Sequence, residues 1–166
     1  MAGSHGRAAV PGLEKENQMA TEQERNKALV LQMYDEVWNK GNLTFIPQAV
    51  SADFIDHPPA GFLHFPAEGL AAIAEAAVTF RKAIPDLHMQ MIRAVADADR
   101  VVYLGQITGT HTGNFLKFPP TGHKISIMGI YDYRMQGGKI AERWSIFDMM
   151  GLMQQVGAMP AGPGGH

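Results

Sequence analysis

The spacing of hydrophobic side chains changes near Leu87, from a helical period to a period of two. Before this position apolar residues recur every three or four residues, and after it apolar and polar residues alternate over long runs. A period of about 3.6 residues is typical of a helix with one buried face, and a period of two is typical of a half-buried strand. The sequence therefore predicts helices followed by a sheet, within one α+β domain.

Three helices are expected before the change, over residues 26–39, 43–50 and 66–84. Gly41 suits the left-handed residue that ends a helix, and Pro85 stops the third one. Residues 53–59 are expected to be extended, because residues that precede proline avoid the helical region.

Four strands are expected after the change, over residues 87–95, 100–110, 124–135 and 139–147. Short turns at 97–99 and 136–138 predict that neighbouring strands pair as antiparallel hairpins. A last short helix is expected over 149–156, with Asp148 as its N-cap.

Composition excludes several classes of function. The chain has 166 residues, which suits one domain, and its net charge of −2 comes with no basic block for nucleic acid. It has no cysteine, so it has neither disulfides nor thiolate chemistry. No run approaches the roughly 20 apolar residues of a membrane span or the roughly 7–15 of a signal peptide. We expect a cytoplasmic protein with a flexible arm at 1–24, a domain at 25–160 and a flexible tail at 161–166.

The predicted strands carry polar groups among core residues. Tyr131 and Tyr133 share one face of the third strand, and Arg143 and Ser145 share one face of the fourth. An apolar pocket with a few convergent polar groups is typical of a small-molecule site. Trp144 falls on the opposite face, which a monomer would leave wet, so we expect a homodimer through that face.

Two histidines are candidates for proton transfer. His57 lies where the helical region gives way to an extended segment, and His111 lies in a glycine-bounded stretch near a strand end. An ordinary histidine pKa of about 6.5 allows proton exchange at neutral pH. The alternative for each is a loop histidine that bonds nearby backbone. No metal or organic cofactor is expected, because the histidines lack ligand spacing and no glycine-rich phosphate loop precedes a helix.

An ordered set of motifs resembles the SnoaL-like polyketide cyclases, of the nuclear transport factor 2-like fold. The set covers about residues 26–160 and comprises Gly109-Thr110-His111-Thr112-Gly113, Pro119-Pro120-Thr121, Arg134 before Gly138-Lys139-Ile140, Asp148-Met149-Met150-Gly151 and Gln155-Val156-Gly157. The resemblance implies a cone-shaped, curved antiparallel sheet that encloses an apolar pocket with three N-terminal helices, and commonly a dimer.

The resemblance also implies roles for single residues. His111 matches a family histidine, Tyr131 falls where the cyclases carry a pocket histidine, and Asp148 matches their second aspartate. Ser145 falls where they carry the catalytic aspartate, and a serine of very high pKa cannot replace a carboxylate as proton shuttle. Acid/base work is therefore expected at His57, His111 or Asp148, with Glu142 as a further candidate.

Three functions are compatible with these residues. The preferred one is acid/base chemistry, a cyclisation or isomerisation, on an aromatic or polyketide-like substrate without a metal. The others are a cofactor-independent hydroxylase of anthracycline-type polyketides and a non-catalytic carrier of a small ligand. The residues expected to bind the substrate are Tyr34, Trp38, Phe54, Tyr131, Tyr133, Arg143, Trp144 and Ser145.

Overall fold

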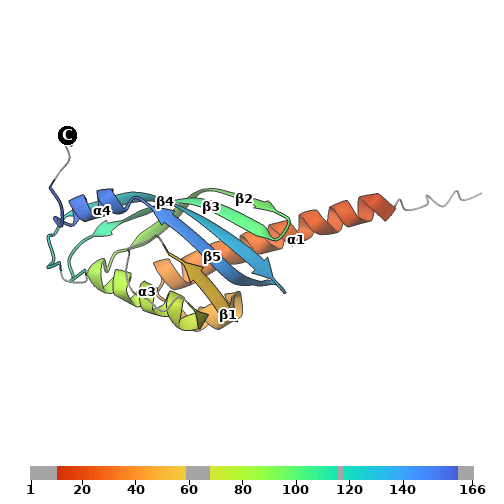
Figure 1. The fold of residues 1–166 in the computed structure, drawn as a ribbon, viewed down its shortest axis with the longest axis horizontal. Helices are drawn as coiled ribbons and strands as arrows, with labels where there is room; N and C mark the ends of the chain where they lie inside the picture. The colour runs from red at the N-terminus through yellow and green to blue at the C-terminus, as the bar shows by residue number, and fades with distance from the viewer. Residues whose placement is uncertain (1–10, 59–67, 116–117, 161–166) are drawn as a thin grey trace, which may run out of the picture.

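A five-stranded curved sheet organises the chain (Figure 1). The computed structural model describes residues 11–58, 68–115 and 118–160, with side chains from Thr21 onward. The strands lie in the order β1-β5-β4-β3-β2. Their bounds are β1 (Val50–His57), β2 (His88–Asp97), β3 (Arg100–Thr110), β4 (Lys124–Gln136) and β5 (Lys139–Phe147).

The expected α+β class is confirmed, and one strand pairing corrects the expected sheet. Strands β2 to β5 are antiparallel neighbours, and tight turns join β2 to β3 and β4 to β5 as expected. β1, however, pairs with β5 in parallel, so the expectation of a wholly antiparallel sheet is wrong at this edge. The reason is that α3 (Gly69–Ala83) follows β1, so no tight turn decides which strand β1 joins.

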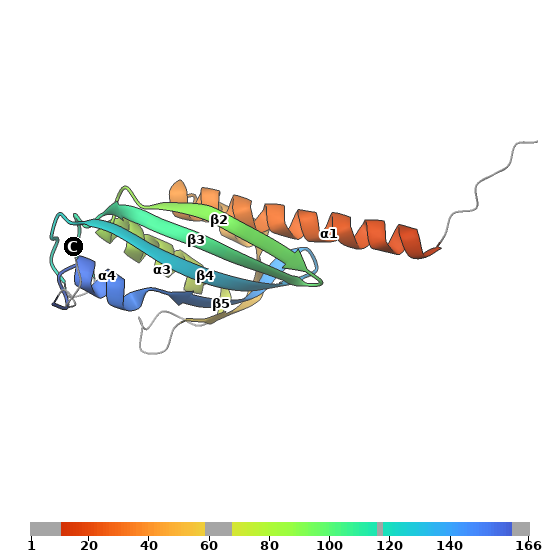
Figure 2. The same cartoon turned by 90° about the horizontal axis from the view of Figure 1, so that it is seen from above.

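The first helix is longer than expected. α1 (Pro11–Met33) is helical from Pro11, so it begins well before the expected start at residue 26. Its N-terminal part extends beyond the end of the sheet (Figures 1 and 2). The expected helix at 43–50 is a 3-10 turn, η2 (Leu43–Phe45), and a short α2 (Ile46–Ala49).

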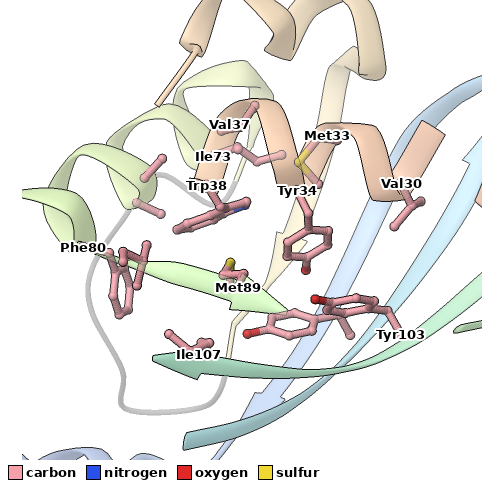
Figure 3. Packing of buried hydrophobic residues seen from close by; sticks show 14 of the residues in the cluster. Val30, Met33, Tyr34, Val37, Trp38, Ile73, Phe80, Met89, Tyr103 and Ile107 are labelled. Atoms are coloured by element: carbon pink, nitrogen blue, oxygen red, sulfur yellow. The ribbon is translucent and has the colours of Figure 1, made fainter. Parts of the chain in front are cut away.

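A π-helix, η1 (Tyr34–Asn39), continues α1 and supplies much of the core. Its buried residues Tyr34, Val37 and Trp38 pack with α3 against one face of the sheet, the inner face (Figure 3). α3 buries Ile73 and Phe80 in the same cluster. Burial of this apolar surface is the main force that holds the helices on the sheet. None of the described helices is both long and apolar enough to span a membrane.

A shift of register in β5 moves one side chain from the face that alternation assigns. Strict alternation places Ile140 with Glu142 and Trp144, yet Ile140 is fully buried. The pairing of β4 with β5 shifts between Arg134 and Met135, and a shift of this kind reverses the faces on either side of it. Ile140 therefore joins the core while Trp144 lies on the opposite, outer face.

The loop after β3 is anchored to the end of α3. The carbonyl oxygen of Ala83 accepts hydrogen bonds from the backbone of residues 112 and 113, at 3.1 and 2.9 Å. A Cβ on Gly113 would lie 1.9 Å from a carbonyl oxygen of α3, so the loop can approach this closely only with glycine. His111, the first residue of this loop, is fully buried, with Nδ1 3.0 Å from the Thr121 hydroxyl. Helix α4 (Met149–Gln155) closes the chain, and Asp148 caps it as expected, accepting from the Gly151 N–H at 2.8 Å.

Large apolar side chains lie on the outer face of the sheet. Ile146 is 72% exposed and Ile130 is 51% exposed, and they lie opposite each other on β5 and β4. Met128 and Ile55, whose side chains are 41% and 39% exposed, lie on the same face. Exposed apolar side chains gathered on one face of a sheet are typical of an interaction surface. We propose that a second copy of the chain covers it, which keeps the expected homodimer as a prediction.

Ile146→Asp is expected to convert the dimer to a monomer, because it places a charge at the most exposed apolar position of the patch. The matched control is Val78→Asp, an exposed position on α3 away from the sheet, which should leave the dimer intact. Multi-angle light scattering at micromolar concentration measures the change. A monomeric parent protein would contradict the prediction.

His111 is expected to make the fold sensitive to acid. Burial, and secondarily repulsion from His123, lower the pKa of His111 below its ordinary value. The unfolded chain, with a histidine pKa of about 6.5, therefore binds more protons than the folded chain below that pH. Stability is fully present above about pH 6.5 and is lost as the pH falls toward the lowered pKa.

His111→Gln should flatten this pH dependence, and His88→Gln, an exposed histidine, should not. Urea unfolding at about pH 7 and about pH 5 gives the change in the free energy of unfolding with pH for each protein. One such group can change this slope by at most about 1.4 kcal/mol per pH unit. Equal slopes in the parent and His111→Gln would show that His111 is not the responsible group.

Candidate functional site

An apolar pocket lies between the inner face of the sheet and the helices that cover it. Figure 3 shows Trp38 and Phe80 from the helices above Met89 and Ile107 from the strands. The cavity has a volume of about 50 Å³. Its lining consists of Trp38, Asp56, Pro58, Ala76, Phe80, Leu87, Met89, Ile107, Tyr131, Arg143, Ser145 and Phe147. Most of these residues are apolar, and four polar side chains, at 56, 131, 143 and 145, come from the adjacent strands β1, β5 and β4.

A buried ion pair forms part of the pocket wall. Asp56 and Arg143 are register partners across β1 and β5, and each side chain is only 7% exposed. The guanidinium donates from Nε to Oδ1 at 2.9 Å and from Nη2 to Oδ2 at 2.6 Å. Burial alone would lower the pKa of Arg143, but the charge and hydrogen bonds of Asp56 outweigh burial and raise it. Arg143 is therefore held in its charged form in an apolar setting.

Asp56 is the site residue that sequence reasoning missed. It appears in the sequence beside His57, and only its alternation with Phe54 along an extended segment places it on a buried face. That signal is weak, because the segment is short and its neighbour in the sheet lies far along the chain. The structure supplies the decisive fact, which is the pairing of β1 with β5.

Two hydroxyl groups lie on the same wall. Tyr131 and Ser145 are directly opposite each other on β4 and β5, they are 5% and 6% exposed, and both line the pocket. Burial chiefly raises the pKa of Tyr131 above its ordinary value. The phenol therefore stays protonated at neutral pH and can donate a hydrogen bond. Ser145 faces the cavity, although it replaces a carboxylate in the motif discussed above.

Three further tyrosines pack behind the pocket. The hydroxyls of Tyr34 and Tyr133 hydrogen-bond to each other, and the ring of Tyr34 stacks on Tyr103 with 4.5 Å between centroids. Burial chiefly raises the pKa of Tyr133 to about 12. Tyr34, Tyr133 and the fully buried Phe54 were expected to bind substrate, but they lie in the core behind the lining residues. They support the wall that carries the ion pair.

His57 lies on the outer face, so its expected position in the pocket is wrong. It is the register partner of Trp144, and its ring stacks on that of Trp144 with 4.3 Å between centroids. Its Nε2 is 3.3 Å from a carboxylate oxygen of Glu142. Trp144 also faces outward, with the guanidinium of Arg100 4.7 Å from its ring centre. The physical reason is that adjacent residues of a strand point to opposite faces. Because Asp56 points inward, His57 and Trp144 cannot contribute to the same pocket.

His111 and Asp148 also lie outside the pocket lining. The ring of Phe115 lies between His111 and Phe80, which lines the cavity. Its centroid is 6.5 Å from that of His111 and 5.4 Å from that of Phe80. Asp148 uses its carboxylate to cap α4. The structure thus brings together Trp38, Tyr131, Arg143 and Ser145 of the expected residues and adds Asp56.

The described residues contain no group of three or more histidine, aspartate or glutamate side chains placed to hold a metal ion. What the site offers is a fixed negative charge, a fixed positive charge and two neutral donors on one wall of an apolar cavity. A carboxylate can accept a proton from a substrate, and a guanidinium or hydroxyl can stabilise the negative charge that then develops. This combination suits proton transfer on a small, largely apolar molecule.

Comparison with solved structures finds the same fold in other proteins. A candidate polyketide cyclase from Acidithiobacillus ferrooxidans is 29% identical, with a TM-score of 0.70 and coverage of 81% of this chain and 95% of that chain. AclR, a candidate hydroxylase from Streptomyces galilaeus, is 28% identical, with a TM-score of 0.73 and coverage of 85% and 86%. A candidate SnoaL-like polyketide cyclase from Jannaschia sp. CCS1 shares the fold at 20% identity, with a TM-score of 0.75 and coverage of 93% and 100%.

A comparison with curated proteins found no match. The family model of the SnoaL-like polyketide cyclases, however, matches residues 28–156. This range contains every strand of the sheet and every residue of the pocket lining. The chain therefore belongs to the SnoaL-like polyketide cyclase family.

Proposed function

We propose that the protein is an enzyme that cyclises or isomerises an aromatic or polyketide-like molecule by acid/base chemistry, without a metal. The observation that carries the proposal is the Asp56–Arg143 ion pair in the wall of an apolar pocket. Membership of the SnoaL-like family supports it. An ion pair that served stability alone would gain little from this position, because desolvation offsets most of its attraction.

The proposed reaction begins with proton abstraction. Asp56 takes a proton from a carbon next to a substrate carbonyl, and the electron pair of that C–H bond moves toward the carbonyl oxygen to give an enolate. Each carboxylate oxygen accepts one hydrogen bond from Arg143 and keeps a further lone pair for the proton. In a cyclisation, the enolate carbon then attacks a second carbonyl carbon of the same molecule, the electron pair of that C=O bond moves to its oxygen, and Asp56 returns its proton to the resulting alkoxide. In an isomerisation, Asp56 instead returns the proton to another position of the enolate.

The proposal moves the proton carrier from the residues expected first. His57, His111 and Asp148 stay predictions from sequence, but none of them lines the pocket. Proton transfer requires the base within hydrogen-bond reach of the proton, directly or through one water. Among the described acidic and histidine side chains, Asp56 alone lines this cavity.

The small volume of the cavity sets a condition on binding. About 50 Å³ holds only a few water molecules, since one water needs roughly 10–15 Å³ measured in this way. A multi-ring substrate therefore requires lining side chains to move apart as it enters. Trp38 of η1 and Phe80 of α3 both line the pocket, and their rings meet edge to face with 6.1 Å between centroids. These are the rings that we expect to move apart.

Hydroxylation is the second candidate, and the likeness to AclR favours it. A hydroxylase of this kind would consume molecular oxygen, with a reduced aromatic substrate as the source of electrons. Oxygen uptake that depends on the substrate distinguishes it from proton transfer, which consumes none. The third candidate, a carrier, would bind the ligand and leave it unchanged.

Asp56→Asn is expected to slow deuterium exchange at the acidic carbon of benzoylacetone, an enolisable aromatic diketone, by about 10²–10⁴-fold. The measurement is proton NMR in deuterated buffer, relative to the rate in buffer alone. The matched control is Asp53→Asn, an exposed carboxylate on the same strand, which should exchange like the parent.

Loss of the Asp56 charge leaves Arg143 buried without a partner, which costs about 3–5 kcal/mol, so circular dichroism must first show that the variant folds. A folded Asp56→Asn protein that exchanges at the parent rate would refute the proposed role. Binding without exchange in the parent would instead indicate a carrier.

A further inference from the structure

Two hydroxyls on the pocket wall are unpaired. Among the described residues, Tyr131 and Ser145 have no side-chain hydrogen-bond partner, whereas the nearby Tyr34 and Tyr133 satisfy each other. The side-chain polar atoms that are both fully enclosed and unpaired lie on Trp38, His111 and Asp132 instead. The hydroxyl oxygens of Tyr131 and Ser145 therefore retain contact with the open space of the pocket, and a ligand can reach them.

A glycine on β4 leaves room for the ring of Tyr131. A Cβ on Gly129 would lie 2.9 Å from both Cε2 and the hydroxyl oxygen of Tyr131, so the ring lies back along its own strand over a position without a side chain. Gly105 is directly opposite Gly129 on β3 and has the same relation to Tyr103, at 2.6 Å. Tyr103 is buried behind the pocket, whereas Tyr131 reaches its lining. The missing Cβ at Gly129 thus sets the height of the Tyr131 hydroxyl above the sheet.

We propose that Tyr131 and Ser145 together bind one oxygen atom of the substrate, a carbonyl oxygen that becomes negatively charged in the reaction. This inference rests on the proposed function and specifies its substrate as a planar enolisable ketone or its phenol-like enol. The two hydroxyls are direct neighbours across β4 and β5, so both can point at one acceptor from the same side. No bond forms or breaks in this step, because each hydroxyl donates a hydrogen bond and keeps its proton.

The chemistry of the pair fits an oxyanion better than it fits a proton carrier. Both groups are neutral donors, and burial keeps the phenol protonated. A carboxylate at position 145 would repel a developing negative charge, whereas a serine hydroxyl stabilises it. Donors in a site that excludes water act strongly on such a charge, because little solvent competes with them. The positive charge of Arg143, two residues before Ser145 on the same face, adds to the attraction.

The test measures the ionisation of a bound phenol. 4-Nitrophenol is a planar ring whose phenolate is identified by its visible absorbance, and nitrobenzene has the same shape without the hydroxyl. The parent protein should bind 4-nitrophenol more tightly than nitrobenzene and should lower the pKa of the bound phenol. Titrations across pH, read by absorbance, give the affinity for the ionised and the neutral form.

Tyr131→Phe and Ser145→Ala should each weaken binding of the phenolate about tenfold, as expected for loss of one hydrogen bond to a charged group, and leave nitrobenzene binding unchanged. Tyr103→Phe removes a hydroxyl that does not line the pocket and should change the affinity for neither ligand. Gly129→Ala should also weaken phenolate binding, since it displaces the Tyr131 hydroxyl, whereas Gly105→Ala displaces Tyr103 and should not.

The outcomes separate this inference from the proposed function. The oxyanion site alone would be overturned if Tyr131→Phe weakened the binding of 4-nitrophenolate and of nitrobenzene equally. An unchanged pKa of the phenol bound to the parent protein would also overturn it. Exchange dependent on Asp56 would then still stand. Failure of the parent to bind either ligand would overturn both, because the pocket would not be a site for aromatic molecules.

Discussion

The ion pair between Asp56 and Arg143 is the interaction on which the site depends. It joins β1 to β5 at the one parallel pairing of the sheet, and it does so through residues that are direct register partners. Loss of either partner would leave a buried charge uncompensated, at a cost of about 3–5 kcal/mol. The pair therefore ties the edge strand to the sheet and brings a carboxylate to the pocket at the same time.

The sheet separates two kinds of surface. The inner face carries the charged pair and the free hydroxyls among apolar side chains, under the cover of η1 and α3. The outer face carries the stack of His57 on Trp144 and the exposed isoleucines at 130 and 146. Because strand residues alternate, Asp56 and His57 are committed to opposite surfaces. The proposed chemistry and the proposed association with a second copy can therefore be tested independently by mutation.

The pocket wall suggests how acid/base chemistry can persist without a carboxylate at position 145. Under the proposed function, the proton carrier is Asp56 on β1, and Ser145 on β5 becomes a hydrogen-bond donor opposite Tyr131. The two roles remain on neighbouring strands and act on adjacent atoms, an acidic carbon and its carbonyl oxygen. The division uses a charged group where a proton must be accepted and neutral groups where negative charge develops.

The sequence by itself determined the α+β class, the two antiparallel hairpins β2–β3 and β4–β5 and the cap of α4, because periodicity, tight turns and capping act between residues close in the chain. Alternation also placed Arg143 and Ser145 on one face of their strand, and the structure shows that this face and Tyr131 line the pocket. Only the tertiary structure decided that β1 joins β5, which placed Asp56 inside and His57 outside, and that a register shift buries Ile140. These outcomes depend on contacts between residues up to about 90 positions apart, which no local pattern encodes.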